Sequence, residues 1–352
     1  MRRKEASMDS IKKKIVVPLL LAACLTAGCA KTVSDGEPPA AVENGTELVY
    51  QQDAAALDDA LAEGEELSLD EIEIEDIDVP LAELPKTMLL PVASGTSTKK
   101  AGGAEIDYSN TADGYVMARY SSTSTSRLKV QVAGPTTTYT YDLPTGGWVT
   151  FPLSDGNGQY KATVLQNTTG KKYAVLASAS FKVTLKDDFA PFLRPNQYVD
   201  YSNAANTVAK AAELTKDLTK TLDKVAAVYD YVIANMTYDK EKAATVQSGY
   251  LPNLDSVLAA KKGICFDYAA LMTGMLRSQG IPCKMVVGYA GTAYHAWVSV
   301  WTEDTGWIDG VIFFDGKVWQ RMDPTFASSG NSSDSIMKYI GDGSNYTTKY
   351  LY

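Results

Sequence analysis

Between residues 87 and 186, apolar and polar residues alternate in a series of short runs. These runs are rich in Tyr, Val and Thr, and turn sequences such as TADG, LPTGG and SDGNG separate them. The runs read AEIDYS, GYVMARY, RLKVQVA, TTYTYDL, GWVTFPL, GQYKATVLQ and YAVLASASFKVTL. About seven strands at this spacing predict an antiparallel β-sandwich domain over residues 87–186. The segment has no cysteine, which favours a spacer or binding module there.

The hydrophobic period changes to that of helices after residue 186. NAANTVAKAAELTKD and TLDKVAAVYDYVIANM are predicted helices, the second with one apolar face. NLDSVLAAKKG predicts a short helix ending at Gly263, a residue suited to the left-handed position past a helix end. Residues 265–279 are apolar nearly all round until Arg277, which indicates a buried helix. Strands are predicted in CKMVVGYA, HAWVSVW, GWIDGVIFF and KVWQRMDPT, so residues 187–352 form a second domain of α+β class.

The N-terminus predicts export from the cytoplasm. Residues 1–28 combine a basic flank with an apolar run, Ile15 to Ala27, that is too short to cross a bilayer. The following TAGC resembles a bacterial lipobox, in which Cys29 would carry lipid and become the first mature residue. Ordinary secretion with cleavage nearby is the alternative, and Met8 is an alternative start. We expect an extracytoplasmic protein, lipid-anchored to the outer face of the bacterial cell membrane.

Charge is concentrated near the N-terminus. The chain has a net charge of −9, and residues 53–85 hold thirteen Asp and Glu but no Lys or Arg. Residues 29–86 are therefore predicted to be an acidic, low-complexity tether. The rest is close to neutral and lacks the basic footprint of a nucleic-acid-binding protein, so we expect no nucleic-acid partner.

Two cysteines remain beyond the predicted signal and tether, and their spacing argues against a disulfide. Cys265 begins the predicted buried helix, which is about 20 Å long at 1.5 Å per residue, while Cys283 lies just past its end. A strand running back along the helix returns to the level of Cys265 only near Gly288 or Tyr289. Bridged cysteines need Cα atoms within about 7 Å, so Cys265 is predicted to be a free thiol. Its place at a helix N-terminus favours the thiolate.

A thiolate nucleophile needs a proton partner, and His295 is the only histidine in the chain. It begins a strand after the short GTA loop, near the predicted level of Cys265. Asp323 stands at a later strand end before a proline and could orient the imidazole, as the acid of a nucleophilic triad does. Each residue alone is more often structural, and one His with one Cys does not make the usual four-ligand metal set. We therefore expect no metal.

These residues carry a resemblance to a known family. GICFDYAALMTGMLRSQGIPCKMVVGY, YHAWVSVW, GWI and MDPTF are similar to the bacterial transglutaminase-like family of papain-like fold, over about residues 200–330. The resemblance implies a catalytic triad of Cys265, His295 and Asp323. The chain departs from the pattern at Cys283, where a small residue or alanine is usual, and in a longer IDGVIFFDGKVWQ hairpin. The β-domain on a tether, of immunoglobulin or fibronectin type, also resembles family members from Gram-positive bacteria.

Supporting residues are less specific. Backbone N–H groups at the start of the helix could form part of an oxyanion hole, with a side-chain donor from Tyr238 or Tyr268. Trp297 shares a strand face with His295 and could shield the site from water, although core packing explains it equally well. Asp267 is interpreted as a first-turn acid facing the helix dipole.

The chemistry that these residues permit is acyl transfer at an amide. Cys265 would form a thioester, which water or an amine would resolve. We expect a cysteine peptidase, amidase or transglutaminase-like acyltransferase that acts on a peptide or protein substrate at the cell surface. We expect no cofactor, and we expect the protein to be a monomer. The alternative is a non-catalytic cell-surface binding or adhesion protein that uses its β-domain.

Overall fold

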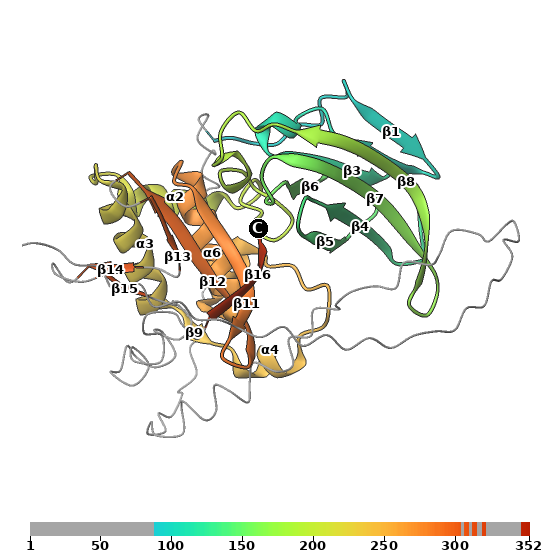
Figure 1. Cartoon of the computed structure of the whole chain (residues 1–352). Helices are drawn as coiled ribbons and strands as arrows, with labels where there is room; N and C mark the ends of the chain where they lie inside the picture. Colours follow the sequence, from blue (N-terminus) through green and yellow to red (C-terminus); the bar gives the residue numbers. More distant parts are fainter. Residues whose placement is uncertain (1–87, 304–305, 310–311, 315–318, 322–345) are drawn as a thin grey trace, which may run out of the picture. The chain divides into compact units, whose positions relative to one another are not determined.

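The computed structural model describes residues 88–303, 306–309, 312–314, 319–321 and 346–352 (Figure 1). The predicted signal segment, the acidic tether, the lipidation site Cys29 and the predicted triad acid Asp323 lie outside these residues. Those expectations stay predictions. In the part of the chain that the structure describes, no helix has both the length and the apolar character needed to cross a membrane.

The first half of the described chain forms two four-stranded antiparallel sheets. The strands are β1 (Thr98–Ala101), β2 (Ala104–Asp107), β3 (Tyr115–Tyr120), β4 (Leu128–Ala133), β5 (Thr138–Asp142), β6 (Val149–Pro152), β7 (Gly158–Thr169) and β8 (Lys172–Val183). One sheet has the order β1-β2-β3-β6 and the other the order β5-β4-β7-β8. Strands β1 and β2 of the first sheet contact β8 of the second.

Alternation of side chains explains these strands. In β4, Leu128, Val130 and Val132 are buried and alternate with partly exposed residues. All seven runs predicted from the sequence contain one strand each. Strand β1 was not predicted because its sequence, TKKA, is mostly exposed and has no apolar alternation.

Helices dominate the segment that follows. They are α2 (Ala205–Thr215), α3 (Thr221–Asn235), α4 (Lys240–Thr245), α5 (Leu254–Ala260) and α6 (Cys265–Ser278). All residues of α6 are buried, as its sequence predicts, and the helix contacts α2, α3 and α5. Two short strands, β9 (Thr237–Tyr238) and β10 (Lys262–Gly263), pair in parallel and tie the chain before α4 to the chain before α6.

A third four-stranded sheet lies against α6 and has the order β13-β12-β11-β16, antiparallel throughout (Figure 1). Its strands are β11 (Cys283–Ala290), β12 (Ala293–Thr302), β13 (Gly306–Asp309) and β16 (Tyr346–Leu351). Strands β14 (Ile312–Phe314) and β15 (Trp319–Arg321) form a separate antiparallel pair. Helices packed on an antiparallel sheet confirm the α+β class.

The role predicted for Gly263 was wrong. Helix α5 ends at Ala260, and the left-handed residue after it is Lys261, at φ 51°. Gly263 instead belongs to β10, where a Cβ atom would lie 2.6 Å from the Cβ of Asp267. The absence of a side chain at this position lets the chain pass close to the start of α6.

Candidate active site

Cys265 is the first residue of α6 and is 1% exposed. Ile264 before it is extended, and its carbonyl accepts the first hydrogen bonds of the helix, from the N–H groups of Asp267 and Tyr268 at 2.9 and 3.1 Å. Neither Cys265 nor Cys283 takes part in a disulfide, which confirms that the two are not bridged. A thiol at the first turn of a helix lies in the positive field of the helix dipole, which favours the thiolate.

Cys283 has a different environment. It is fully buried at the start of β11, and burial raises the pKa of its thiol to about 11. The nearby Arg277 guanidinium and the Thr273 hydroxyl oppose this rise without cancelling it. Cys283 is therefore a neutral thiol near pH 7 and serves as a small core residue.

His295 is the third residue of β12 and is 2% exposed. It lies directly across from Gly288 of β11, and α6 packs against both strands. Gly288 is also where the sequence predicts that β11 returns to the level of Cys265. A Cβ atom at Gly288 would lie 2.0 Å from the carbonyl oxygen of Thr347, so only glycine fits where β16 crosses this point. The pairing of β11 with β16 shifts register at the same place.

Aromatic rings enclose the imidazole. The ring of Trp297 stacks on His295, with centroids 6.2 Å apart and planes 22° apart. Tyr346 of β16 lies edge-on to Trp297 at 5.0 Å and tilted to His295 at 6.4 Å. Sequence reasoning missed Tyr346, because β16 follows a long stretch without a clear periodic pattern. His295 and Trp297 lie on the opposite face of β12 from Ala296 and the other residues that join the main core.

The two tyrosines proposed as oxyanion donors occupy different places. Tyr268 lies in the first turn of α6 and is fully buried. Tyr238 lies in β9 directly across from Gly263, two residues before Cys265. Both elements lead to the start of α6, and the choice between the two residues stays open.

Asp267 does more than face the helix dipole. Its fully buried carboxylate accepts hydrogen bonds from the Ile264 N–H at 2.9 Å, the Lys242 ammonium at 2.6 Å and the Tyr250 hydroxyl at 2.6 Å. The Lys242 ammonium also lies 4.2 Å from the centroid of the Tyr250 ring. Burial, together with the adjacent Asp267 carboxylate, raises the pKa of Tyr250, which keeps its hydroxyl a donor. The network fixes the chain immediately before Cys265.

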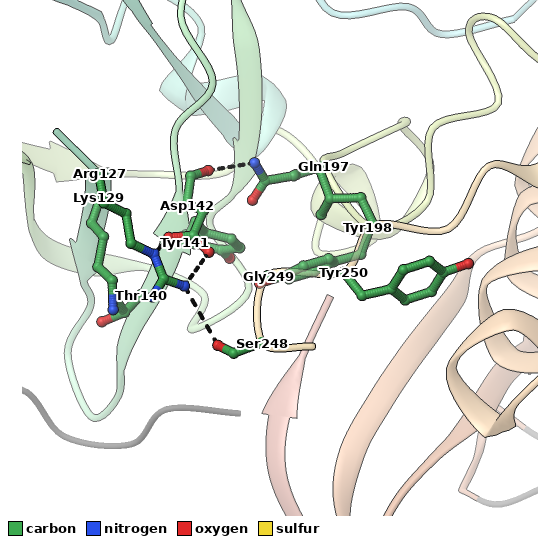
Figure 2. Close-up of a pocket in the computed structure, with 11 residues that line it drawn as sticks. Arg127, Lys129, Thr140, Tyr141, Asp142, Gln197, Tyr198, Ser248, Gly249 and Tyr250 are labelled. Carbon is green, nitrogen blue, oxygen red and sulfur yellow. Dashed lines mark hydrogen bonds and ion pairs between the residues drawn. The ribbon is translucent and has the colours of Figure 1, made fainter. Parts of the chain in front are cut away.

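This network is supported from the β-domain. Arg127 pairs with the Asp142 carboxylate through two hydrogen bonds of 2.7 and 2.8 Å, and it also donates to the Ser248 hydroxyl at 3.4 Å (Figure 2). Ser248 lies two residues before Tyr250. A signal for the network was present in the sequence, because an acid on an otherwise apolar helix needs a buried partner. The identity of that partner could not be read from the pattern.

Comparison with known proteins supports the family expected from the motifs. Residues 208–324 match the model of the transglutaminase-like superfamily. The chain therefore contains a transglutaminase-like domain. The match includes the positions of Cys265, His295 and Asp323.

The sequence relatives match only a part of this chain. The chain is 32% identical over 118 residues to the uncharacterized protein YebA of Bacillus subtilis, covering 28% of this chain and 16% of that protein. It is 32% identical over 68 residues to a protein-glutamine gamma-glutamyltransferase of Pseudomonas aeruginosa, covering 15% of this chain and 10% of that one. The crystal structure of red sea bream transglutaminase aligns with 64% of this chain and 53% of its own, at 13% identity and a TM-score of 0.29. The chain thus spans less than a fifth of the length of these two sequence relatives.

Proposed function

We propose that the chain is a cysteine acyl-transfer enzyme that acts on peptide or isopeptide amide bonds. The observation that carries this proposal is the placement of Cys265, a cysteine outside any disulfide at the first turn of a buried helix that packs on the strand of the only histidine. The superfamily match supports it. So does the similarity to a protein-glutamine gamma-glutamyltransferase, whose name describes acyl transfer.

The reaction follows from the properties of these side chains. The Cys265 sulfur attacks the amide carbonyl carbon after its proton passes to His295, and Asp323 holds the imidazole in the required tautomer. His295 then protonates the departing amine, the C–N bond breaks and a thioester remains. Water activated by His295 releases the acid, or a second amine releases a new amide. We favour hydrolysis.

The start of α6 supplies the other requirement of this chemistry, which is stabilisation of the oxyanion. Backbone N–H groups at a helix N-terminus are fixed donors aimed at developing negative charge. The Asp267 network holds this turn in place through Ile264, so we assign Asp267 a positioning role. The aromatic rings of Trp297 and Tyr346 keep the imidazole in a water-poor environment.

A substrate screen tests the proposal. Wild type and Cys265→Ala would be incubated with cell-wall peptides, with casein, and with a glutamine donor plus an amine acceptor. We expect a product in at least one reaction with wild type and none with Cys265→Ala. Equal product from both proteins with every substrate would contradict the proposal.

A binding function is the second candidate, and one observation favours it. Cys265 and His295 are 1% and 2% exposed, so a substrate needs the site to open before it reaches the thiol. A non-catalytic surface protein that binds a partner through its β-domain would need no such opening.

The setting of the domain belongs to the same proposal. We propose that the chain is exported and held by a lipid on Cys29, with residues 29–86 as tether, as a monomer on the outer face of a Gram-positive membrane. The two antiparallel sheets would form a sandwich of immunoglobulin or fibronectin type that spaces the catalytic domain from the surface. Palmitate labelling of cells that express wild type or Cys29→Ala would test the anchor.

A further inference from the structure

A cleft of about 380 Å³ lies among residues that the candidate active site does not use. This volume falls in the range of small-ligand sites. Its walls come from the start of the described chain, from the region around β6 and from the loop before α2. The residues that matter for its chemistry are Leu90, Pro91, Trp148, Asn196, Gln197 and Leu251.

Two amide side chains in this lining have unused hydrogen-bonding capacity. Asn196 is 4% exposed, and its Oδ1 atom accepts from the N–H groups of Tyr198 and Val199 at 2.9 and 3.1 Å. Its Nδ2 group is buried without a partner. A buried donor left unsatisfied is costly and calls for an explanation.

Gln197 shows the complementary pattern. It is 8% exposed, and its Nε2 group donates to the Asp142 carbonyl oxygen at 2.5 Å (Figure 2). Its Oε1 atom is buried without a partner. Neighbouring residues thus offer one unused donor and one unused acceptor, which is the pair that a secondary amide satisfies.

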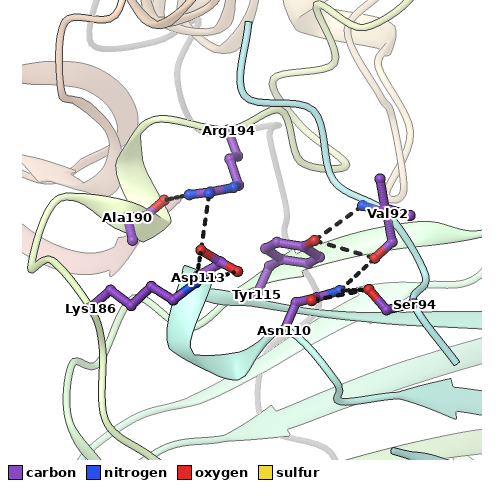
Figure 3. A network of polar contacts seen from close by, with 8 residues as sticks. All are labelled: Val92, Ser94, Asn110, Asp113, Tyr115, Lys186, Ala190 and Arg194. Atoms are coloured by element: carbon purple, nitrogen blue, oxygen red, sulfur yellow. Dashed lines mark hydrogen bonds and ion pairs between the residues drawn. The ribbon is translucent and has the colours of Figure 1, made fainter. Parts of the chain in front are cut away.

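The walls of the cleft are held in place. The backbone of Val92 is fixed by the Tyr115 hydroxyl, at 3.1 and 3.2 Å, and by the Asn110 amide at 2.7 Å (Figure 3). On the other side, the Arg194 guanidinium donates to Asp113 at 3.4 Å and to the Ala190 carbonyl oxygen at 3.2 Å. These contacts fix the chain beside Pro91 and Pro195, so a ligand would meet a preformed surface.

The remaining lining indicates the polarity of the ligand. Leu90 and Leu251 are 42% and 38% exposed, and together with the half-buried Trp148 they give the cleft an accessible apolar surface. Among the described residues that line the cleft, the one ionisable side chain is Asp200, and its carboxylate accepts from Ser202 and Asn203. The cleft therefore offers no cation to an anionic ligand.

We propose that this cleft binds an uncharged peptide segment. An apolar side chain of the peptide packs against the two leucines and Trp148. The peptide carbonyl oxygen accepts a hydrogen bond from the Nδ2 group of Asn196, and the peptide N–H donates one to the Oε1 atom of Gln197. A saccharide fits less well, because more than half of the lining residues are apolar or proline and each sugar ring brings several hydroxyls. The site is independent of Cys265, so it stands or falls separately from the proposed enzyme.

Photo-crosslinking of the full chain tests this proposal. The probe is acetyl-Ala-photoleucine-Ala-amide, used on Cys265→Ala protein so that nothing is turned over, with crosslinks located by mass spectrometry. We expect crosslinks concentrated on the peptides that contain Leu90, Trp148 and Leu251. Unlabelled acetyl-Ala-Leu-Ala-amide should compete them away.

Three variants in this background sharpen the test. Asn196→Asp keeps the Oδ1 acceptor of the turn but loses the donor, and should lower capture by about tenfold. Leu251→Ser changes an exposed side chain, leaves the fold intact and should lower capture several-fold. Asn157→Asp is the matched control: it keeps the Oδ1 acceptor for Leu185 N–H and should capture as well as the parent.

The contrary results are equally definite. Crosslinks scattered over the surface, or undiminished capture by both Asn196→Asp and Leu251→Ser, would overturn the proposal. Competition by a tetramer of N-acetylglucosamine but not by the leucine peptide would assign the cleft to a saccharide and would also overturn it.

Discussion

Replacing Asp267 by asparagine should destabilise the fold strongly, although the change is nearly isosteric. The carboxylate is fully buried and accepts from Lys242, Tyr250 and Ile264, whereas an amide has one acceptor and brings a donor into the same space. Breaking a buried ion pair from one side costs about 3–5 kcal/mol. The Lys242 side chain is 27% exposed, so water recovers part of the loss. We expect the free energy of unfolding to fall by about 3 kcal/mol.

Urea unfolding of a double-mutant cycle would measure this loss. The double change, Lys242→Met with Asp267→Asn, removes one shared interaction. Its loss in unfolding free energy should therefore be smaller than the sum of the two single losses, by at least about 1.5 kcal/mol. Glu213→Gln is the matched control: its pair with Lys210 has the same 2.6 Å distance but lies on the surface, and no measurable change is expected. A loss below about 0.5 kcal/mol for Asp267→Asn, or additive single changes, would refute the reasoning.

Three further predictions concern the packing of α6 and the sheet beside it. Gly288→Ala places a methyl group 2.0 Å from the Thr347 carbonyl oxygen, so β16 must shift; a loss of about 1–3 kcal/mol in urea unfolding is expected, and an unchanged midpoint would contradict the fit. The buried Arg277 guanidinium donates three hydrogen bonds, to the main-chain oxygens of Cys283, Arg194 and Tyr352. Arg277→Lys removes at least two of them and should lower the free energy of unfolding by about 3 kcal/mol or more. Stability close to that of wild type would be the contrary result. Burial raises the pKa of Cys283 from 9.0 to about 11, so the unfolded thiol ionises first and stability falls as pH rises from 9 toward 11; at 1.36 kcal/mol per pKa unit the loss is about 1 kcal/mol between pH 9 and 10, and Cys283→Ala should lack it.

The sequence predicted the central helix and the hairpin beside it well, because each has a strong local pattern. Residues 265–276 are apolar nearly all round, and Gly280 with Pro282 ends the helix. The strands CKMVVGYA and HAWVSVW follow within a few residues, so little topology had to be guessed. The absence of a disulfide between Cys265 and Cys283 followed from the lengths of the helix and the strand after it.

Other elements could not be predicted, for physical reasons. Strand β1 is exposed and polar, and β16 gains its identity by pairing with β11, more than fifty residues earlier in the chain. Gly263 was predicted to be the residue past the end of a helix, yet its role depends on the approach of Asp267. Contacts between segments distant along the chain produce no periodic pattern in the sequence.

The candidate site divides in the same way. The residues of the proposed triad were predicted from their chemistry and from the order of the motifs. The contacts of Lys242 and Tyr250 with Asp267 are evident only in the structure. Their partner, Asp267, was interpreted as a first-turn acid facing the helix dipole, because a sequence pattern does not show which partners a buried charge meets. The network gives the turn before Cys265 a rigidity that the motif alone did not imply.

The central claim is that His295 activates Cys265, and the rate of alkylation by iodoacetamide tests it most directly. Rates would be measured from pH 5 to 9 on wild type, His295→Ala and Cys265→Ala, with the modified residue located by mass spectrometry. We predict that iodoacetamide modifies Cys265 and not Cys283. Wild type should react at least about tenfold faster than His295→Ala near pH 6.5, where an unassisted thiol is mostly protonated. Equal rates for wild type and His295→Ala across this pH range would contradict it.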